Sequence, residues 1–222
     1  MVAVVQAVPD SMVRVSIDGK TVEAQAGAGD VLGPFPLTPG KHEIDFAGAD
    51  DVSVTTTLQV KASSHQDVVL HRPASVGGAA VVTSYPTPTD PIGPGKARVQ
   101  VAHTATVAPA DVVVDGMVVF SNIANGEFAT ADVPAGKHVV ALFPTGQKSD
   151  PLLGPLEVTL APGTVTMVYA LGEAASMELV VHTARLAADG SVFPVMIDTG
   201  SAGLARSIRV TPFGPGSGAR AK

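Results

Sequence analysis

The feature of this sequence that most constrains its fold is an internal repeat. Residues 13–19 read VRVSIDG and residues 110–116 read ADVVVDG. Residues 37–46 read LTPGKHEIDF, and the similar segment at residues 133–143 reads VPAGKHVVALF. Features that occur in both copies must serve a shared backbone, so features found in one copy only are the better candidates for function.

The repeat extends over most of the chain and predicts its domain organisation. Residues 68–85 align with residues 167–184 without a gap, and equivalent residues lie roughly 97 apart throughout. Two copies of one fold unit therefore follow each other head to tail in the 222 residues. We predict a first unit, a proline-rich linker that holds the units apart, a second unit, and a tail with a possible edge strand, at residues 1–86, 87–96, 97–198 and 199–222.

The pattern within each copy predicts short β-strands. Valine often occurs in pairs or triplets, and branching at Cβ favours strands over helices. Apolar residues alternate with polar ones in segments such as residues 13–17, and no long segment has helical periodicity. In the first copy we predict eight strands, at residues 2–8, 13–17, 20–24, 31–37, 41–46, 52–60, 67–70 and 79–85.

Turn residues separate these predicted strands at equivalent places in the two copies. The pairs Asp18-Gly19 and Asp115-Gly116 each lie between two strands, and Asp-Gly is a strong signal for a two-residue hairpin. Gly40 and Gly136 mark a second turn, each followed by a strand that begins Lys-His. The sequence therefore predicts an all-β fold of two tandem β-sandwich domains, either immunoglobulin-like or transthyretin-like.

The second copy also resembles a known family. Residues 99–116 read VQVAHTATVAPADVVVDG, and residues 133–137 read VPAGK. This pattern resembles the bacterial "domain of unknown function 4397" family, and the first copy resembles it more loosely, with Gln6 in place of His103 and Met12 in place of Pro109. The resemblance implies secreted or cell-surface β-sandwich modules, often in tandem, with no catalytic residue to carry over. It therefore implies an exported protein whose signal peptide has been removed.

Composition excludes several classes of function. The net charge is −6, no Lys/Arg cluster occurs, and aromatic residues make up 4% of the chain, so nucleic-acid binding is not expected. No apolar stretch reaches membrane-spanning length. The absence of cysteine excludes disulfides and thiol chemistry.

One motif points to an enzyme. Residues 195–204 read VMIDTGSAGL, and Asp198-Thr-Gly-Ser resembles the catalytic turn of aspartic proteases, in which two aspartates share a proton. That chemistry needs a second carboxylate and a flap, and too little sequence follows Asp198 to supply them. A strand end followed by a turn is the preferred interpretation, and we predict no catalytic residue, cofactor or metal ion.

The histidines are weaker candidates for a functional site. His42 and His138 occupy equivalent positions, which favours a scaffold role, and we expect them to be exposed on their strands. His103 and His182 occur in the second copy only and could lie close together if the first and last strands are neighbours. Two imidazoles alone make a poor metal site, so a packed or hydrogen-bonded pair is the preferred interpretation.

These observations predict a non-enzymatic structural or adhesive module at the bacterial cell surface, bound to another protein or to itself. A self-assembling filament or surface-layer subunit is one alternative, and an aspartic-protease-like enzyme acting through Asp198 is another. For self-assembly, a terminal strand would complete the sheet of a neighbouring copy. The candidate segment alternates weakly and contains Arg206, Ile208, Arg209, Val210 and Phe213.

Overall fold

A computed structural model of the chain describes residues 1–49, 51–174, 176–186, 192–201 and 204–207, the last two ranges, apart from Val192, by their backbone only. The described residues form strands and turns without any helix, as predicted. They build four antiparallel or mixed sheets, arranged as two pairs. The prediction of two tandem β-sandwiches is therefore confirmed.

The first repeat is a sandwich of two four-stranded sheets. Sheet A has the order β4-β1-β7-β8, in which the central strands β1 and β7 run parallel. Sheet B has the order β3-β2-β5-β6. The eight strands match the eight predicted from the sequence: β1 (Val2–Ala7), β2 (Met12–Ile17), β3 (Lys20–Gly27), β4 (Val31–Phe35), β5 (Gly40–Ala47), β6 (Val54–Val60), β7 (Gln66–His71) and β8 (Val81–Pro86).

The second repeat copies this plan and extends it. Sheet E has the order β11-β10-β13-β14, and sheet C has the order β12-β9-β15-β16-β17-β18. The last two strands have no counterpart in the first repeat. The strands are β9 (Lys96–His103), β10 (Ala110–Val114), β11 (Met117–Ile123), β12 (Phe128–Pro134), β13 (Gly136–Pro144), β14 (Leu153–Leu160), β15 (Thr164–Leu171), β16 (Glu178–Leu186), β17 (Val192–Ser201) and β18 (Leu204–Ser207).

This strand order distinguishes between the two predicted kinds of sandwich. A constant-type immunoglobulin domain has its first, second, fourth and fifth strands in one sheet. Here the first strand lies between the fourth and the seventh, and the second lies between the third and the fifth. The arrangement is therefore the transthyretin-like one.

Strand pairing corrects one detail of the predicted repeat alignment. Val4 pairs with Val68 in the first repeat, and its equivalent Val101 pairs with Val168 in the second. Val68 is therefore equivalent to Val168, whereas the ungapped alignment placed it opposite Met167. The error matters because a shift of one residue moves every side chain to the other face of a strand.

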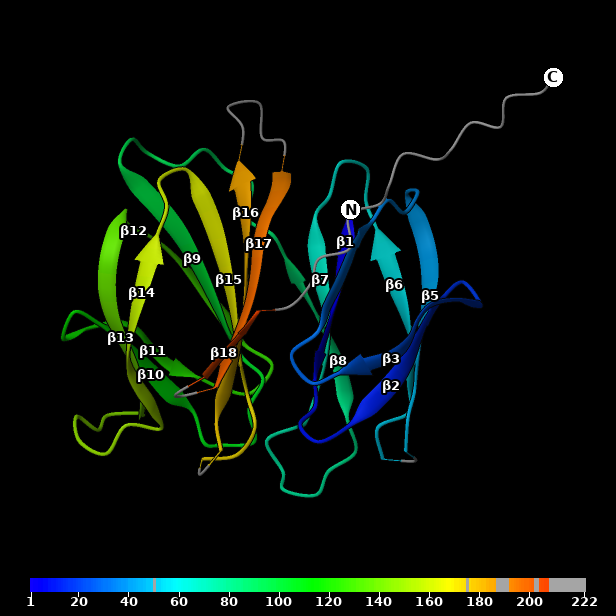
Figure 1. The fold of residues 1–222 in the computed structure, drawn as a ribbon, viewed down its shortest axis with the longest axis horizontal. Coiled ribbons are helices and arrows are strands. Elements are labelled where there is room, and N and C mark those ends of the chain that lie inside the picture. Colours follow the sequence, from blue (N-terminus) through cyan, green and yellow to red (C-terminus); the bar gives the residue numbers. More distant parts are fainter. Residues whose placement is uncertain (50, 175, 187–191, 202–203, 208–222) are drawn as a thin grey trace.

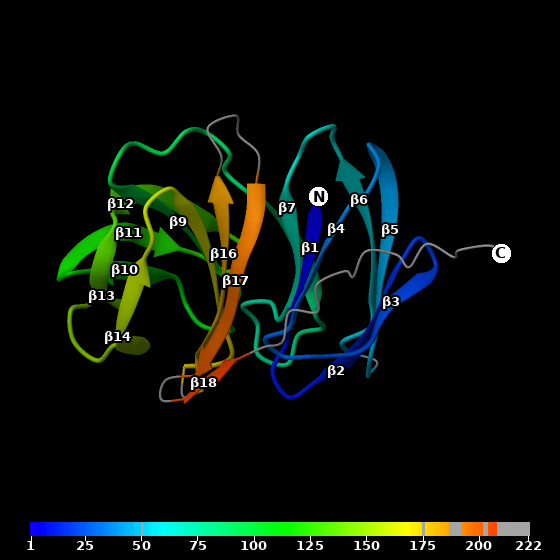
Figure 2. The same ribbon diagram turned by 45° about the horizontal axis from the view of Figure 1, so that its top comes forward.

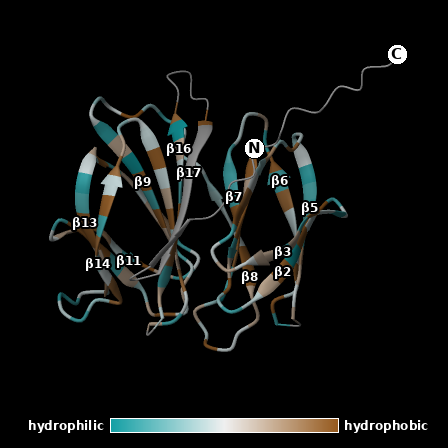
Figure 3. Cartoon of the chain, in the orientation of Figure 1, coloured by the Kyte–Doolittle hydropathy of each residue, from teal (hydrophilic) through white to brown (hydrophobic). Residues whose placement is uncertain are grey.

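The two repeats pack face to face rather than standing apart. Figures 1 and 2 show four layers in succession, with sheets A and C in the middle and sheets B and E outside. A single apolar cluster joins Val5, Val69 and Tyr85 of sheet A to Tyr169 and Val180 of sheet C. Sheet A is thus buried on both faces, and in Figure 3 β1 is largely hydrophobic whereas hydrophobic and hydrophilic segments alternate along the outer strand β5.

The linker is held against the second repeat, so the predicted role of a spacer is wrong. Arg98 on β9 donates hydrogen bonds to the carbonyl oxygens of Asp90 (2.7 Å) and Pro91 (3.4 Å). The same guanidinium forms a bidentate ion pair with Asp132 on β12, at 2.6 and 3.0 Å. Because Arg98 is itself held by Asp132, its hydrogen bonds to Asp90 and Pro91 fix the linker against the second repeat. The linker therefore adds to the rigidity of the two-domain protein.

Candidate functional site

Each repeat contains a histidine-aspartate pair that ties its first hairpin to a neighbouring strand. Asp18 and Gly19 have φ angles of 50° and 75°, as a type I′ turn requires. The Asp18 carboxylate accepts hydrogen bonds from Nδ1 of His42 (2.7 Å) and from the backbone N–H of Glu43 (3.0 Å). The other nitrogen of His42, Nε2, donates to the carbonyl oxygen of Thr38 at 2.8 Å.

The second repeat reproduces this arrangement. His138 contacts Asp115 through Nδ1 at 2.7 Å and the Pro134 carbonyl through Nε2 at 2.8 Å, while Val139 N–H donates to Asp115 at 2.9 Å. The hydrogen bond to Asp115 raises the pKa of His138 above its ordinary value, and Asp18 does the same for His42. Both histidines are buried, so the expectation of exposed strand residues is wrong. Their presence in both copies makes them part of the scaffold.

The interface between the repeats contains a buried carboxylate. Asp67 on β7 is 3% exposed and accepts hydrogen bonds at one oxygen from the hydroxyl of Tyr169 and from Nε2 of His182, the latter at 2.6 Å. The rings of Tyr169 and His182 stack with an interplanar angle of 16°. Burial, together with the Asp67 charge, raises the pKa of Tyr169 well above its ordinary value, so the hydroxyl stays a donor.

Further polar contacts join the two repeats at the end of β7. The side-chain N–H groups of Asn125 donate to the carbonyl oxygens of Arg72 (3.0 Å) and Ala105 (2.9 Å). The Thr106 hydroxyl donates to the Pro73 carbonyl at 3.1 Å. The interface therefore combines an apolar centre with directional hydrogen bonds, which fix the orientation of one repeat on the other.

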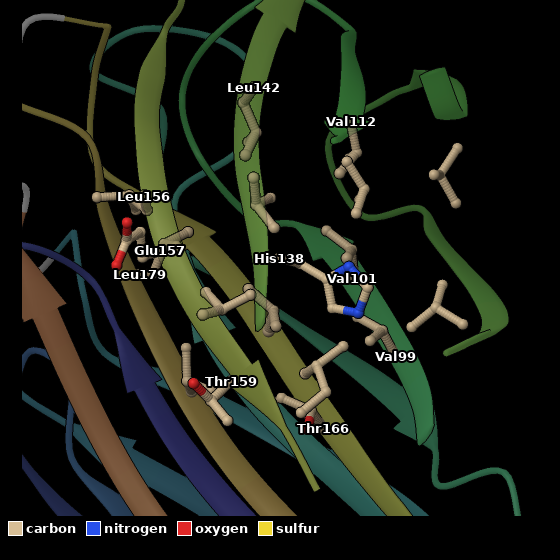
Figure 4. Close-up of a pocket in the computed structure, with 18 of the residues that line it drawn as sticks. Val99, Val101, Val112, His138, Leu142, Leu156, Glu157, Thr159, Thr166 and Leu179 are labelled. Atoms are coloured by element: carbon tan, nitrogen blue, oxygen red, sulfur yellow. The ribbon is translucent and has the colours of Figure 1, made fainter. Parts of the chain in front are cut away.

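A cavity of about 350 Å³ lies between the two sheets of the second repeat. Figure 4 shows Leu142, Val112 and Val101 among its walls, with Leu156 and Leu179 toward another side. The lining is mainly aliphatic and comes from both sheets: Val99, Val101, Val112, Val114, Val119, Phe120, Val133, His138, Val140, Leu142, Leu156, Glu157, Val158, Thr159, Leu160, Thr166, Val168, Leu179, Val181 and Thr183.

A cavity of this size is a candidate binding site. Ligand pockets in proteins commonly measure about 300–1,000 Å³ and are mostly apolar. Core cavities in proteins cost about 24 cal/mol per Å³ when empty, so this one would cost about 8 kcal/mol if closed and dry. That is similar to the whole stability of a small domain, which is about 5–15 kcal/mol. An occupant that fills the cavity would bury its aliphatic walls and so stabilise the fold.

Asp198 of the enzyme hypothesis and Arg206 of the assembly hypothesis lie in the last two strands of sheet C. Asp198 is inside β17, where its backbone pairs with Val181 and Ser207, so the predicted strand end comes only at Ser201. Arg206 is in β18 and pairs with Thr199. The rest of the predicted assembly segment, namely Ile208, Arg209, Val210 and Phe213, lies outside the described residues.

His103 and His182 do not form the close pair that the sequence suggested. His103 on β9 and His182 on β16 are separated by β15, and each has its own hydrogen-bond partner. His103 Nε2 contacts the Ala108 carbonyl at 3.2 Å, while burial lowers the pKa of the ring. Within the described residues, no three His, Asp or Glu side chains are grouped so as to hold a metal ion. The same part of the chain contains no helix long and apolar enough to cross a membrane.

Sequence reasoning missed both the interface and the cavity. The interface had a signal, because residues 2–8 form a nearly continuous apolar run that is typical of a strand buried on both faces. The signal for the cavity was the smaller size of three second-repeat residues on β10 and β13 than of their first-repeat equivalents, as in Val140 for Ile44. The Asp67 contact had none, since its partners are more than a hundred residues away.

Comparison with known proteins agrees with the resemblance seen in the sequence. A family model described as "Domain of unknown function (DUF4397)" matches residues 1–110. These residues comprise the whole first repeat, the linker and the first strand of the second repeat. No curated protein matches the chain. The matched repeat is the one whose motifs fit the family more loosely. Through this match the chain belongs to the DUF4397 family.

Proposed function

We propose that this protein is a non-enzymatic structural or adhesive module of the bacterial cell surface, in which two sandwiches act as one rigid body. The observation that carries the proposal is the face-to-face packing of sheets A and C around Asp67, Tyr169 and His182. A surface module must keep its shape while it bears load or presents a binding face. The extensive apolar contact and the pinned linker both support that role.

The use of polar side chains also supports a structural role. His42 and His138 hold hairpins, His71 bonds to Arg72 and Thr83, and His182 bonds to Asp67. General acid-base and nucleophilic catalysis require such groups to face a substrate. In the described part of the chain these rings instead face other protein groups.

The test is cellular. Antibodies against the folded protein should label intact cells, and a strain without the gene should attach less well or have a weaker envelope. Wild-type protein and Asp198→Asn should both restore the phenotype. Labelling that requires permeabilised cells, or unchanged attachment and envelope strength in the deletion strain, would contradict the proposal. Failure of Asp198→Asn alone to restore the phenotype would favour the protease-like alternative.

Self-assembly is a second candidate, favoured by the position of β18. This strand ends sheet C and pairs with β17 on one side only among the described residues. A sheet edge of this kind can accept a strand from another molecule. Light scattering at high protein concentration should then detect polymers of the full chain but not of a truncation lacking residues 204–222. Polymers that persist without these residues would refute this mechanism.

A further inference from the structure

We infer that the cavity of the second repeat binds a neutral aliphatic chain, such as a medium-length alcohol. This inference is independent of the cell-surface role. It depends on the size of the cavity, the chemistry of its walls and a comparison between the two repeats.

The first repeat shows what a filled version of the same core looks like. In that repeat Ile17 pairs with Ile44, whereas the equivalent pair in the second repeat is Val114 and Val140. In the same way Phe46, which pairs with Val15, is replaced by Leu142, which pairs with Val112. Each replacement removes volume from the centre of the sandwich.

All three of the smaller residues, Val114, Val140 and Leu142, line the cavity. The shared fold therefore does not require the space at these three positions, where the first repeat carries larger side chains on the same strands, although Leu156 in the second repeat replaces the smaller Thr56. The edges of the two sandwiches differ too: β6 and β8 approach each other closely, and their equivalents β14 and β16 do so less. The second repeat is thus more open than the first at this edge, whereas at the opposite edge its strands β11 and β12 approach each other more closely than β3 and β4 do.

The walls favour an apolar ligand with little hydrogen-bonding capacity. Most of the lining is valine and leucine, and both nitrogens of His138 already donate to Asp115 and to the Pro134 carbonyl. The hydroxyls of Thr166 and Thr183, which pair across β15 and β16, can serve one small neutral polar group. This set suits the hydroxyl of an alcohol.

The charge at the cavity disfavours an anionic ligand. Glu157 on the edge strand β14 is exposed and belongs to the lining, as Figure 4 shows. No arginine or lysine lines the cavity to neutralise a ligand carboxylate. The charge of His138, which also lines the cavity, is already paired with Asp115. A fatty-acid anion would therefore meet the like charge of Glu157 without a free counter-charge, whereas an alcohol of the same length would not.

The shape of the cavity favours a chain over a compact ring. Its lining residues come from all four strands of sheet E, from β11 at one edge to β14 at the other. Neighbouring strands are about 4.8 Å apart, so the lining extends over roughly 14 Å across the sheet. An extended alkyl chain can follow this direction and contact both sheets along its length.

The test uses the full chain with 1-decanol and decanoate as probes, below the concentrations at which they aggregate. Methyl NMR titration should give saturable shifts at Val112, Val140 and Val168, with decanol at least ten-fold tighter than decanoate. The variant Val140→Ile/Leu142→Phe, which restores the first repeat's residues, should weaken decanol binding at least ten-fold. Val118→Ile, on an exposed residue of the same sheet, is the matched control and should change nothing.

Three results would overturn the inference: no saturable binding of decanol, equal affinity for decanoate, or unchanged binding in the filled variant. If the filled variant does not fold, a xenon titration of the wild-type protein, followed by methyl NMR, serves as the test instead. Xenon should shift the methyl groups of the same three valines and should compete with decanol. Xenon shifts confined to other residues would also overturn the inference.

Discussion

Asp67 in the first repeat accepts a hydrogen bond from Nε2 of His182, 115 residues further along the chain, at 2.6 Å. The two side chains are only 5% and 10% exposed, so water competes little for this contact. The Tyr169 hydroxyl donates to the same oxygen. One carboxylate oxygen of the first repeat therefore holds two adjacent strands of the second, and this contact fixes how the sandwiches meet.

Replacing Asp67 by Ala should destabilise the whole protein. The change leaves two buried donors without an acceptor, and each unsatisfied group costs about 1–3 kcal/mol. Urea unfolding followed by circular dichroism measures the loss. The exposed Glu178→Gln is the control and should stay within about 0.5 kcal/mol of wild type. A loss below that limit for Asp67→Ala would contradict the assigned role.

Cutting the linker should not separate the repeats. A protease site introduced at residues 87–89 would break the covalent connection and leave the pinned Asp90 and the apolar interface in place. The nicked protein should elute from a size-exclusion column as one species of unchanged size. Combining the cut with Asp67→Ala should release the two halves. Two separate species after the cut alone would show that the interface is too weak to hold the units together.

The histidine-aspartate pairs should make stability depend on pH in a defined direction. Both ring nitrogens of His42 donate to acceptors, which requires the protonated ring, and the hydrogen bond to Asp18 raises its pKa above 6.5. The stabilisation is therefore complete below pH 6.5 and is lost as the pH rises through the folded-state value. The hydrogen bond from His42 lowers the pKa of Asp18 below 3.8, so the pair is fully charged between these limits.

The measurement compares wild type with His42→Gln by urea unfolding at about pH 5.5 and pH 9. The variant should lose more stability at the lower pH, and His138→Gln should behave in the same way. His71 provides the opposite control, because burial lowers its pKa and the neutral ring is the stable form. His71→Gln should therefore lose more at the higher pH. Equal losses at both pH values for His42→Gln would contradict the raised pKa.

The hairpin glycines should resist substitution because of backbone strain alone. Gly19 and Gly116 have φ angles of 75° and 79°, and a Cβ atom at either position would meet nothing within 4 Å. Valine at either position should cost about 1–3 kcal/mol. Asparagine, which tolerates this conformation, should cost less. Thermal unfolding distinguishes them, and equal effects of valine and asparagine would indicate a cause other than backbone strain.

The sequence predicted local structure better than contacts between the repeats. All eight strands of the first repeat were predicted, because alternation and Asp-Gly turns are short-range signals. The packing of sheet A on sheet C depends on side chains such as Asp67 and Tyr169, which are distant in sequence. His42 was assigned to the scaffold correctly but placed on the surface, since alternation alone does not show that Asp18 would cover it. The cavity results from small volume differences that no motif records.

The position of Asp67 is occupied by Met167 in the second repeat, since Asp67 pairs with Ala3 and Met167 with the equivalent Gln100. Equivalent faces of the repeats meet, yet only one of them carries the buried acceptor. Two first repeats joined in this way would bury carboxylates without His182 to donate to them, which is costly. The linker adds a high local concentration of the correct partner. Each chain should therefore keep its own halves together, and even densely packed molecules should resist exchanging domains.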